Sequence, residues 1–188
     1  MHSFFRFICN TIAVTTLIIT SIANAQNHTH HNHDAHDHGL AQITLAIDVN
    51  TILINLVAPA HSLIGFEHRA HTPEEITTVH NLKKSLANNK LVLTVPKAGC
   101  ILIESKIETG ELLAVDESKH PPHNSHSKHN EITVSYNLRC PQLANVSTAS
   151  VHLFEYFPEI EEINVLWITE SQQGAASLTA QDNIISWQ

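Results

Sequence analysis

The chain has 188 residues, and its 18 acidic residues exceed its 10 lysines and arginines, which gives a formal charge of −8. This balance argues against nucleic-acid binding, because a negative surface is repelled by phosphates, and it favours cations as partners. The 16 histidines are the most unusual part of the composition. Neutral imidazole is the commonest protein ligand for metals such as Zn²⁺, so the composition predicts metal binding.

Residues 1–25 have the pattern of a secretory signal peptide. Arg6 supplies a basic start, residues 12–22 form an apolar stretch, and residues 23–25 (Ala-Asn-Ala) are typical of a cleavage site. The apolar stretch is too short to span a bilayer, so we expect no membrane insertion of the mature chain. The mature chain would still be long enough for one domain with a hydrophobic core.

A histidine-rich tail follows the expected cleavage site. We expect residues 26–39 to be flexible, because they carry almost no apolar side chains. A flexible segment can place three or four imidazoles around one Zn²⁺ ion at about 2.0–2.1 Å, at a cost in chain entropy. The candidate ligands in the tail are His28, His30, His31, His33, His36 and His38.

We expect a single metal-binding domain over residues 40–188, and its first predicted element is a β-hairpin. Residues 42–47 and 52–57 alternate apolar and polar side chains and are separated by a short polar turn. This pattern is typical of two paired antiparallel strands. Pro59 ends the second strand, because proline has no backbone N–H to donate.

A helix is predicted to begin at Pro73. Thr72 can cap it, Pro73 suits its first position and Glu75 completes a capping box. The apolar residues that follow keep helical spacing up to Asn88-Asn89, and they are Ile76, Val79, Leu82 and Leu86.

Glu67 and His68, within the sequence Gly65-Phe66-Glu67-His68, come just before this helix. They are candidate ligands for an ordered metal site that residues of the tail complete. The alternative is ordinary polarity at the entry to a helix. His80 shares the helical stripe and His152 lies in a strand-like run, and we expect both to be packed or partly exposed rather than ligands.

The later elements follow from the same patterns. Further strands are predicted over residues 100–107, 132–138, 163–168 and 184–187, with a short turn or helix at 141–145 and an amphipathic segment at 151–157. Residues 116–130 form a polar, histidine-rich loop. Strands joined by short links, with few helices between them, favour an α+β fold with a mainly antiparallel sheet.

The histidines of this loop recur at every third position, and the candidate ligands are His120, His123, His126 and His129. Pro121 and Pro122 favour polyproline II, which has three residues per turn and would place the four imidazoles on one face. At roughly 3.1 Å per residue, neighbouring histidines would be about 9 Å apart, too far for one ion. The loop must therefore bend or pair its histidines with other groups; a loop without a role is the alternative.

The chain has three cysteines, and Cys9 would leave with the signal peptide. Cys100 and Cys140 remain as an even pair in an exported chain, which favours a disulfide. Two free thiols, available as metal ligands, are the alternative. The only methionine is the initiator, so the mature chain has no thioether. This argues against Cu(I) and for Zn²⁺, with Ni²⁺ and Cu²⁺ as competitors.

Common catalytic motifs are absent from the sequence, including H-E-x-x-H, G-x-S-x-G, the P-loop and G-x-G-x-x-G. The nearest match to the H-x-H-x-D-H motif of metallo-β-lactamase-type hydrolases is residues 28–33, where Asn32 stands in place of the required aspartate. This match lies in the tail, with no strand before it. We therefore expect no enzyme activity, and a zinc-dependent hydrolase is the weakest alternative.

Short motifs spread over the mature chain carry a family resemblance. The more specific ones are Gly65-Phe66-Glu67-His68 and the two cysteines, in Ala98-Gly99-Cys100 and in the stretch from His129 to Cys140-Pro141. The others are His36-Asp37-His38-Gly39, Ala58-Pro59-Ala60, Leu153-Phe154, Phe157-Pro158 and Ile163-Asn164-Val165-Leu166-Trp167. With these motifs the chain resembles the ZrgA-like family of exported zinc-binding proteins of Gram-negative bacteria over essentially its whole mature length.

The resemblance implies a periplasmic zinc protein that assists zinc uptake together with an inner-membrane zinc transporter. It also implies control by zinc starvation. Carried over position by position, the best candidates for ordered ligands are His36, His38, Glu67, His68 and His129.

We predict a periplasmic protein that captures Zn(II) and delivers or buffers it. The flexible histidine tracts would collect the ion, and an ordered site would hold it. The alternative is a buffer or resistance protein for zinc, nickel or Cu(II) that has no transporter partner.

Overall fold

The computed structural model describes residues 39–113 and 130–187, and all structural statements concern this part of the chain. The predicted signal peptide, the candidate ligands of the tail and the four candidate histidines of the loop lie outside it. In the described part, no helix is long and apolar enough to cross a membrane.

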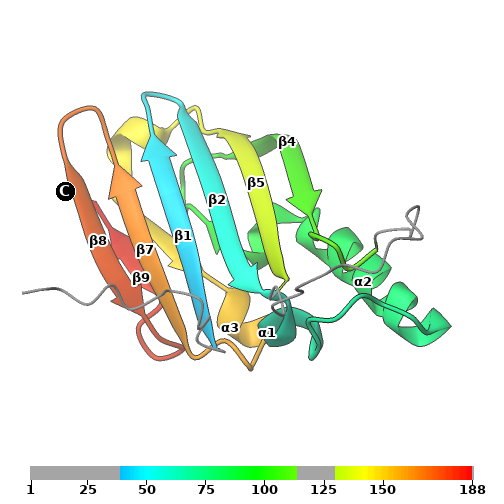
Figure 1. Ribbon diagram of the computed structural model, residues 1–188. Helices are drawn as coiled ribbons and strands as arrows, with labels where there is room; N and C mark the ends of the chain where they lie inside the picture. Colours follow the sequence, from blue (N-terminus) through cyan, green and yellow to red (C-terminus); the bar gives the residue numbers. More distant parts are fainter. Residues whose placement is uncertain (1–38, 114–129, 188) are drawn as a thin grey trace, which may run out of the picture. The chain divides into compact units, whose positions relative to one another are not determined.

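Six strands of the described part form one sheet, in the order β4-β5-β2-β1-β7-β8 (Figure 1). Their bounds are Leu40–Ile47 (β1), Thr51–Pro59 (β2), Ile101–Glu108 (β4), Glu131–Arg139 (β5), Glu162–Ile168 (β7) and Gln173–Leu178 (β8). The neighbouring strands are antiparallel except β1 and β7, which are parallel. The predicted hairpin is confirmed, since β1 and β2 pair from Gln42–Val57 to Ile47–Ile52.

Helices and a smaller sheet complete the described fold. The helices are Ala60–Ile64 (α1), Pro73–Leu86 (α2) and Leu153–Tyr156 (α3), with short 3₁₀ turns at Asn89–Leu91 and Leu143–Asn145. The smaller sheet has the order β3-β6-β9, with bounds Leu93–Thr94, Thr148–Val151 and Ile184–Ser186. This confirms the predicted α+β class with a mainly antiparallel sheet.

One face of the large sheet forms the core together with α2. Alternate residues of β1, such as Ile43 and Leu45, are buried because successive strand side chains point to opposite faces. Helix α2 buries Val79, Leu82 and Leu86 at helical spacing. The phenol of Tyr136 on β5 donates a hydrogen bond to the carbonyl of Leu86 at 2.6 Å, and burial raises the pKa of this phenol. The helix is therefore fixed to the sheet by a buried polar contact as well as by apolar packing.

The predicted start of α2 is confirmed in detail. Oγ1 of Thr72 accepts a hydrogen bond from the backbone N–H of Glu75 at 3.1 Å, and the carboxylate of Glu75 accepts one from the N–H of Thr72 at 3.1 Å. This capping box satisfies two backbone donors that the helix itself leaves unpaired.

Several elements differ from the predictions, among them the following three. Pro59 ends β2 as expected, but the chain enters α1 at once, and five residues are too few for a helical period to be visible in the sequence. The segment at 151–157 divides into the end of β6 and helix α3. Strand β8 was not predicted because two of its three inward residues, Gly174 and Ala176, are small. Gly174 leaves room for the ring of Trp167, with which an added Cβ would collide.

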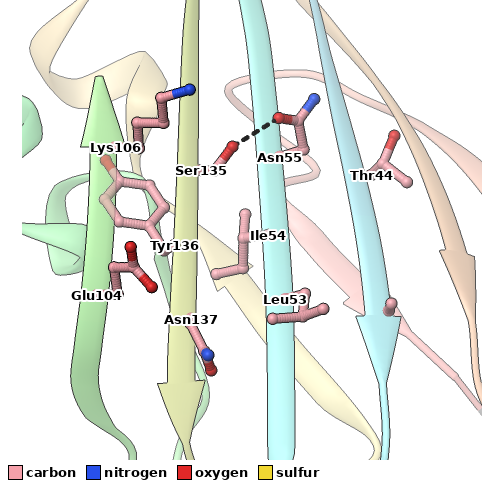
Figure 2. Close-up of a pocket in the computed structure, with 10 residues that line it drawn as sticks. Thr44, Leu53, Ile54, Asn55, Glu104, Lys106, Ser135, Tyr136 and Asn137 are labelled. Carbon is pink, nitrogen blue, oxygen red and sulfur yellow. Dashed lines mark hydrogen bonds between the residues drawn. The ribbon is translucent and has the colours of Figure 1, made fainter. Parts of the chain in front are cut away.

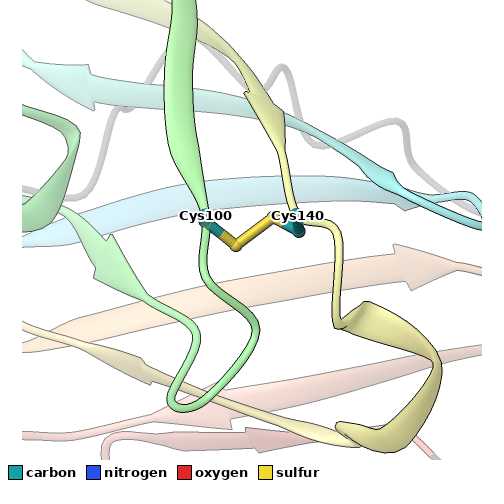
Figure 3. Close-up of a disulfide and its surroundings, with 2 residues drawn as sticks. All are labelled: Cys100 and Cys140. Atoms are coloured by element: carbon teal, nitrogen blue, oxygen red, sulfur yellow. A yellow bond between two sulfur atoms is a disulfide. The ribbon is translucent and has the colours of Figure 1, made fainter.

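The predicted disulfide between Cys100 and Cys140 is confirmed (Figure 3). It joins the residue before β4 to the residue after β5, two neighbouring strands of the large sheet. The S–S distance is 2.04 Å and the bridged residues are 40 positions apart.

Candidate metal centre

Glu67 and His68, the two candidate ligands that the structure describes, lie in the connection between α1 and α2. Gly65 ends α1 in a left-handed conformation with φ of 82°, and residues 66–72 then run outside regular structure. Glu67 is half-buried, and its Oε1 atom is shielded from solvent. His68 is more open, with 55% of its side-chain surface exposed.

Glu75, in the first turn of α2, holds this connection against the helix. Its Oε1 atom lies 3.0 Å from Nε2 of His68, and its Oε2 atom accepts hydrogen bonds from the backbone N–H groups of His71 at 2.8 Å and Thr72 at 3.1 Å. The hydrogen bonds from the backbone of His71 and Thr72, followed by that with His68, lower the pKa of Glu75 from 4.5 to about 2. The carboxylate is therefore ionised at neutral pH.

Two aromatic neighbours lie beside the imidazole of His68. Its ring centroid is 5.0 Å from that of Phe66, with the planes inclined by 35°. It is 6.1 Å from that of His71, with the planes nearly parallel at 11°. Ring contacts of this kind add to the hydrogen bond with Glu75 in orienting the imidazole.

Asn130, the residue next to His129 in the chain, ties three segments together. Its Nδ2 donates a hydrogen bond to the carbonyl of Glu67 at 2.7 Å, and its Oδ1 accepts one from the backbone of Glu111 at 3.1 Å. Its own carbonyl accepts a hydrogen bond from the N–H of Ala60 at 2.8 Å. The residue that follows the histidine loop is therefore held directly beside the Glu67-His68 segment.

Gly39, the last residue of the histidine-rich tail, is anchored to α1. The N–H of Gly39, next to His38 in the chain, donates to the buried hydroxyl of Ser62 in α1 at 3.0 Å. The carbonyl of Gly39 accepts hydrogen bonds from the backbone of Glu161 and Glu162. Gly39 has φ of 92°, and a side chain there would press on the carbonyl of Glu159 at 3.2 Å. Only glycine takes this conformation without strain.

The third anchor lies where the chain enters the histidine loop. The carbonyl of Leu112 accepts a hydrogen bond from the N–H of Ala70 at 2.9 Å. The three described points that adjoin the histidine-rich segments, at Gly39, Leu112 and Asn130, are therefore all hydrogen-bonded to residues 60–70.

Three further described histidines lie outside the connection between α1 and α2. His61 is half-buried in α1, and His80 is exposed on α2. His152 uses both ring nitrogens, with Nε2 2.8 Å from Oγ1 of Thr94 and Nδ1 3.0 Å from Oε1 of Glu155. His152 agrees with the expectation of a packed or partly exposed residue, whereas His80 is exposed and not packed.

Glu75 and Asn130 were not predicted as parts of this site. Glu75 was recognised only as a member of the capping box, although its position seven residues after His68 allows a contact once the chain turns into the helix. Asn130 lies 63 residues from Glu67, and no local pattern connects the two.

The described part of the chain contains no group of three or more histidine, cysteine, aspartate or glutamate side chains placed to hold one metal ion. A separate hollow of about 400 Å³ lies on the face of the large sheet that points away from the core (Figure 2). Its lining includes Thr44, Leu53, Asn55, Glu104 and Lys106. Glu104 is the only metal-ligating side chain among its described lining residues, so this hollow is less suited to zinc than the α1–α2 connection.

Comparison with known proteins gives one family. A search of curated proteins found no match. The model of the family described as "ZrgA family zinc uptake protein" matches residues 35–187, from just before His36 to the end of the described structure. Since the match covers most of the chain, including the α1–α2 connection and both cysteines, this chain belongs to the ZrgA family of zinc uptake proteins.

Proposed function

We propose that this protein is a periplasmic zinc-binding protein that captures Zn²⁺ and assists its uptake. Membership of a zinc uptake family supports the uptake role. The observation that carries the proposal further is the anchoring of both histidine-rich segments on one stretch of the fold. The N–H of Gly39 donates a hydrogen bond to the hydroxyl of Ser62, and the side chain of Asn130 donates one to the carbonyl of Glu67.

The anchors restrict where the nearest tract histidines can reach. Consecutive Cα atoms are about 3.8 Å apart, so His38 stays next to anchored Gly39, and His129 stays next to anchored Asn130. Zinc usually takes four nitrogen, oxygen or sulfur ligands. We therefore propose an ordered site at Glu67 and His68 whose remaining ligands come from among His36, His38 and His129.

The remaining histidines would act as collectors. Those farther from the anchors (His28, His30, His31, His33, His120, His123 and His126) would bind zinc more weakly and raise its concentration near the ordered site. An acidic chain adds a general attraction for cations.

Two features support a periplasmic location. The disulfide between Cys100 and Cys140 fits an oxidising compartment, because cytosolic thiols are kept reduced. The first 25 residues have the pattern of a cleaved signal. In the periplasm, an inner-membrane zinc transporter is the proposed recipient of the captured ion.

Growth of a strain lacking the gene tests the function. If the protein serves uptake, the deletion impairs growth when a chelator limits zinc, and the intact gene restores it. Substituting both Glu67→Gln and His68→Ala should abolish this rescue, whereas His80→Ala, which changes an exposed histidine of α2, should not. A deletion phenotype that appears only in excess metal would instead favour the buffering alternative.

A further inference from the structure

We propose that Glu75 is a positioning residue that keeps the proton of His68 on Nε2, so that Nδ1 is the nitrogen which binds zinc. This inference rests on the proposed zinc site at Glu67 and His68, and it specifies the ligand atom of that site.

The hydrogen bonds of Glu75 set the direction of the contact with His68. Its Oε2 atom already accepts from two backbone N–H groups, those of His71 and Thr72. Its Oε1 atom lies 3.0 Å from Nε2 of His68. An ionised carboxylate can only accept hydrogen bonds, so Nε2 must be the donor and must carry the ring proton of the neutral imidazole.

The other ring nitrogen of His68 is then the one with a free lone pair. In residues 39–113 and 130–187, Nδ1 of His68 has no hydrogen-bond partner, and more than half of the side-chain surface is exposed. A neutral imidazole that donates through one nitrogen binds metal through the other. The geometry therefore assigns the metal to Nδ1.

Glu75 is well placed to hold the ring still. Its backbone N–H donates to Oγ1 of Thr72 within the capping box, and α2 itself is fixed to the core by Val79, Leu82 and Leu86. The imidazole is thus connected to a rigid element through one hydrogen bond. Carboxylates that hold a metal-bound histidine in this way orient the ring and raise its basicity, and losing one typically costs about 10- to 100-fold in metal affinity.

The alternative is that Glu75 acts only as a helix cap, and three variants of the exported protein separate the two roles. Glu75→Gln keeps a side chain that can cap the helix, but its amide can donate as well as accept, so it no longer fixes the tautomer. Thr72→Ala weakens the cap and leaves the contact between Glu75 and His68. Glu74→Gln removes the neighbouring exposed carboxylate and is the charge control.

Two measurements test the proposal. Long-range ¹H–¹⁵N correlation spectra of the metal-free protein should show His68 protonated on Nε2, and in Glu75→Gln they should show a mixture of tautomers. Zinc titration in competition with a chelator, which suppresses the weak histidine sites, should give an affinity about 10- to 100-fold lower for Glu75→Gln. Glu74→Gln and Thr72→Ala should bind as the parent does.

The outcomes distinguish this inference from the proposed function. If His68→Ala weakens zinc binding but Glu75→Gln does not, the positioning role is wrong and the zinc site stands. If Glu75→Gln and Thr72→Ala weaken binding equally, the effect comes from the helix cap and the positioning role is again wrong. If His68→Ala binds zinc as tightly as the parent, both the proposed site and the positioning role fail.

Discussion

Asn130 connects the histidine loop to the rest of the candidate site. Its side chain bonds the carbonyl of Glu67 and the N–H of Glu111, and its carbonyl bonds the N–H of Ala60. A single asparagine thus joins three segments that are far apart in the sequence, next to one proposed ligand, His129.

Substituting Asn130→Ala should lower both stability and zinc affinity. The change leaves the carbonyl of Glu67 and the N–H of Glu111 without their side-chain partner, which should cost about 1–3 kcal/mol in the free energy of unfolding. Urea unfolding measures this loss. Asn137→Ala, at a half-buried position on β5, is the control. Equal zinc affinity in Asn130→Ala and the parent would argue against a role for Asn130 in the site.

The lowered pKa of Glu75 predicts a particular dependence of stability on pH. Folding lowers the pKa of Glu75 from 4.5 to about 2. The ionised carboxylate therefore stabilises the folded protein fully at pH values above the ordinary pKa of 4.5. This contribution should be lost as the pH drops from about 4.5 to about 2. Glu75→Gln lacks it, so its stability should fall less steeply in this range than that of the parent.

Urea midpoints measured from pH 7 to pH 2 check this expectation, with Glu74→Gln as the control. A constant difference in midpoint between the parent and Glu75→Gln over this whole range would contradict the argument, since the two proteins should converge once Glu75 is protonated.

At the scale of elements, local patterns predicted those parts whose cause is local. Helix α2 begins at Pro73 as predicted because its cap and its apolar spacing lie within the same few residues. The hairpin of β1 and β2 follows from alternation and a short turn. The parallel pairing of β1 with β7 joins residue 40 to residue 162, and no local pattern contains that information.

The disulfide is an element-scale contribution that can be removed cleanly. It closes a loop across 40 positions, and the chain-entropy model gives a stabilisation of about 4 kcal/mol for such a loop. The double substitution Cys100→Ala and Cys140→Ala should lower the free energy of unfolding by about this amount. Denaturant unfolding measures the change.

The same double variant also tests whether the cysteines are ligands. Because both sulfur atoms are joined in the disulfide, neither is a thiolate that could bind zinc. Zinc affinity of the folded variant should therefore equal that of the parent, and a large loss would mean that the thiols serve as ligands.

At the scale of the whole molecule, sequence and structure contribute different parts of the account. The composition pointed to metal, and Glu67 and His68 could be singled out because they directly precede a well-marked helix. The anchors around them could not be, since Gly39, Leu112 and Asn130 reach residues 60–70 through hydrogen bonds that are long-range in sequence. The division into signal peptide, tail and one domain, and the roles of the tract histidines, stay predictions.

The central claim is that one ordered zinc site at Glu67 and His68 exists apart from the collecting histidines. Calorimetric zinc titration of the mature protein and of a variant lacking residues 26–35 and 120–128 tests it most directly, because that variant keeps His36, His38 and His129. We predict that the variant retains one tight zinc site, loses the weaker ones, and loses the tight site as well when His68→Ala is added. Loss of all zinc binding in the variant, despite a folded domain, would contradict the claim.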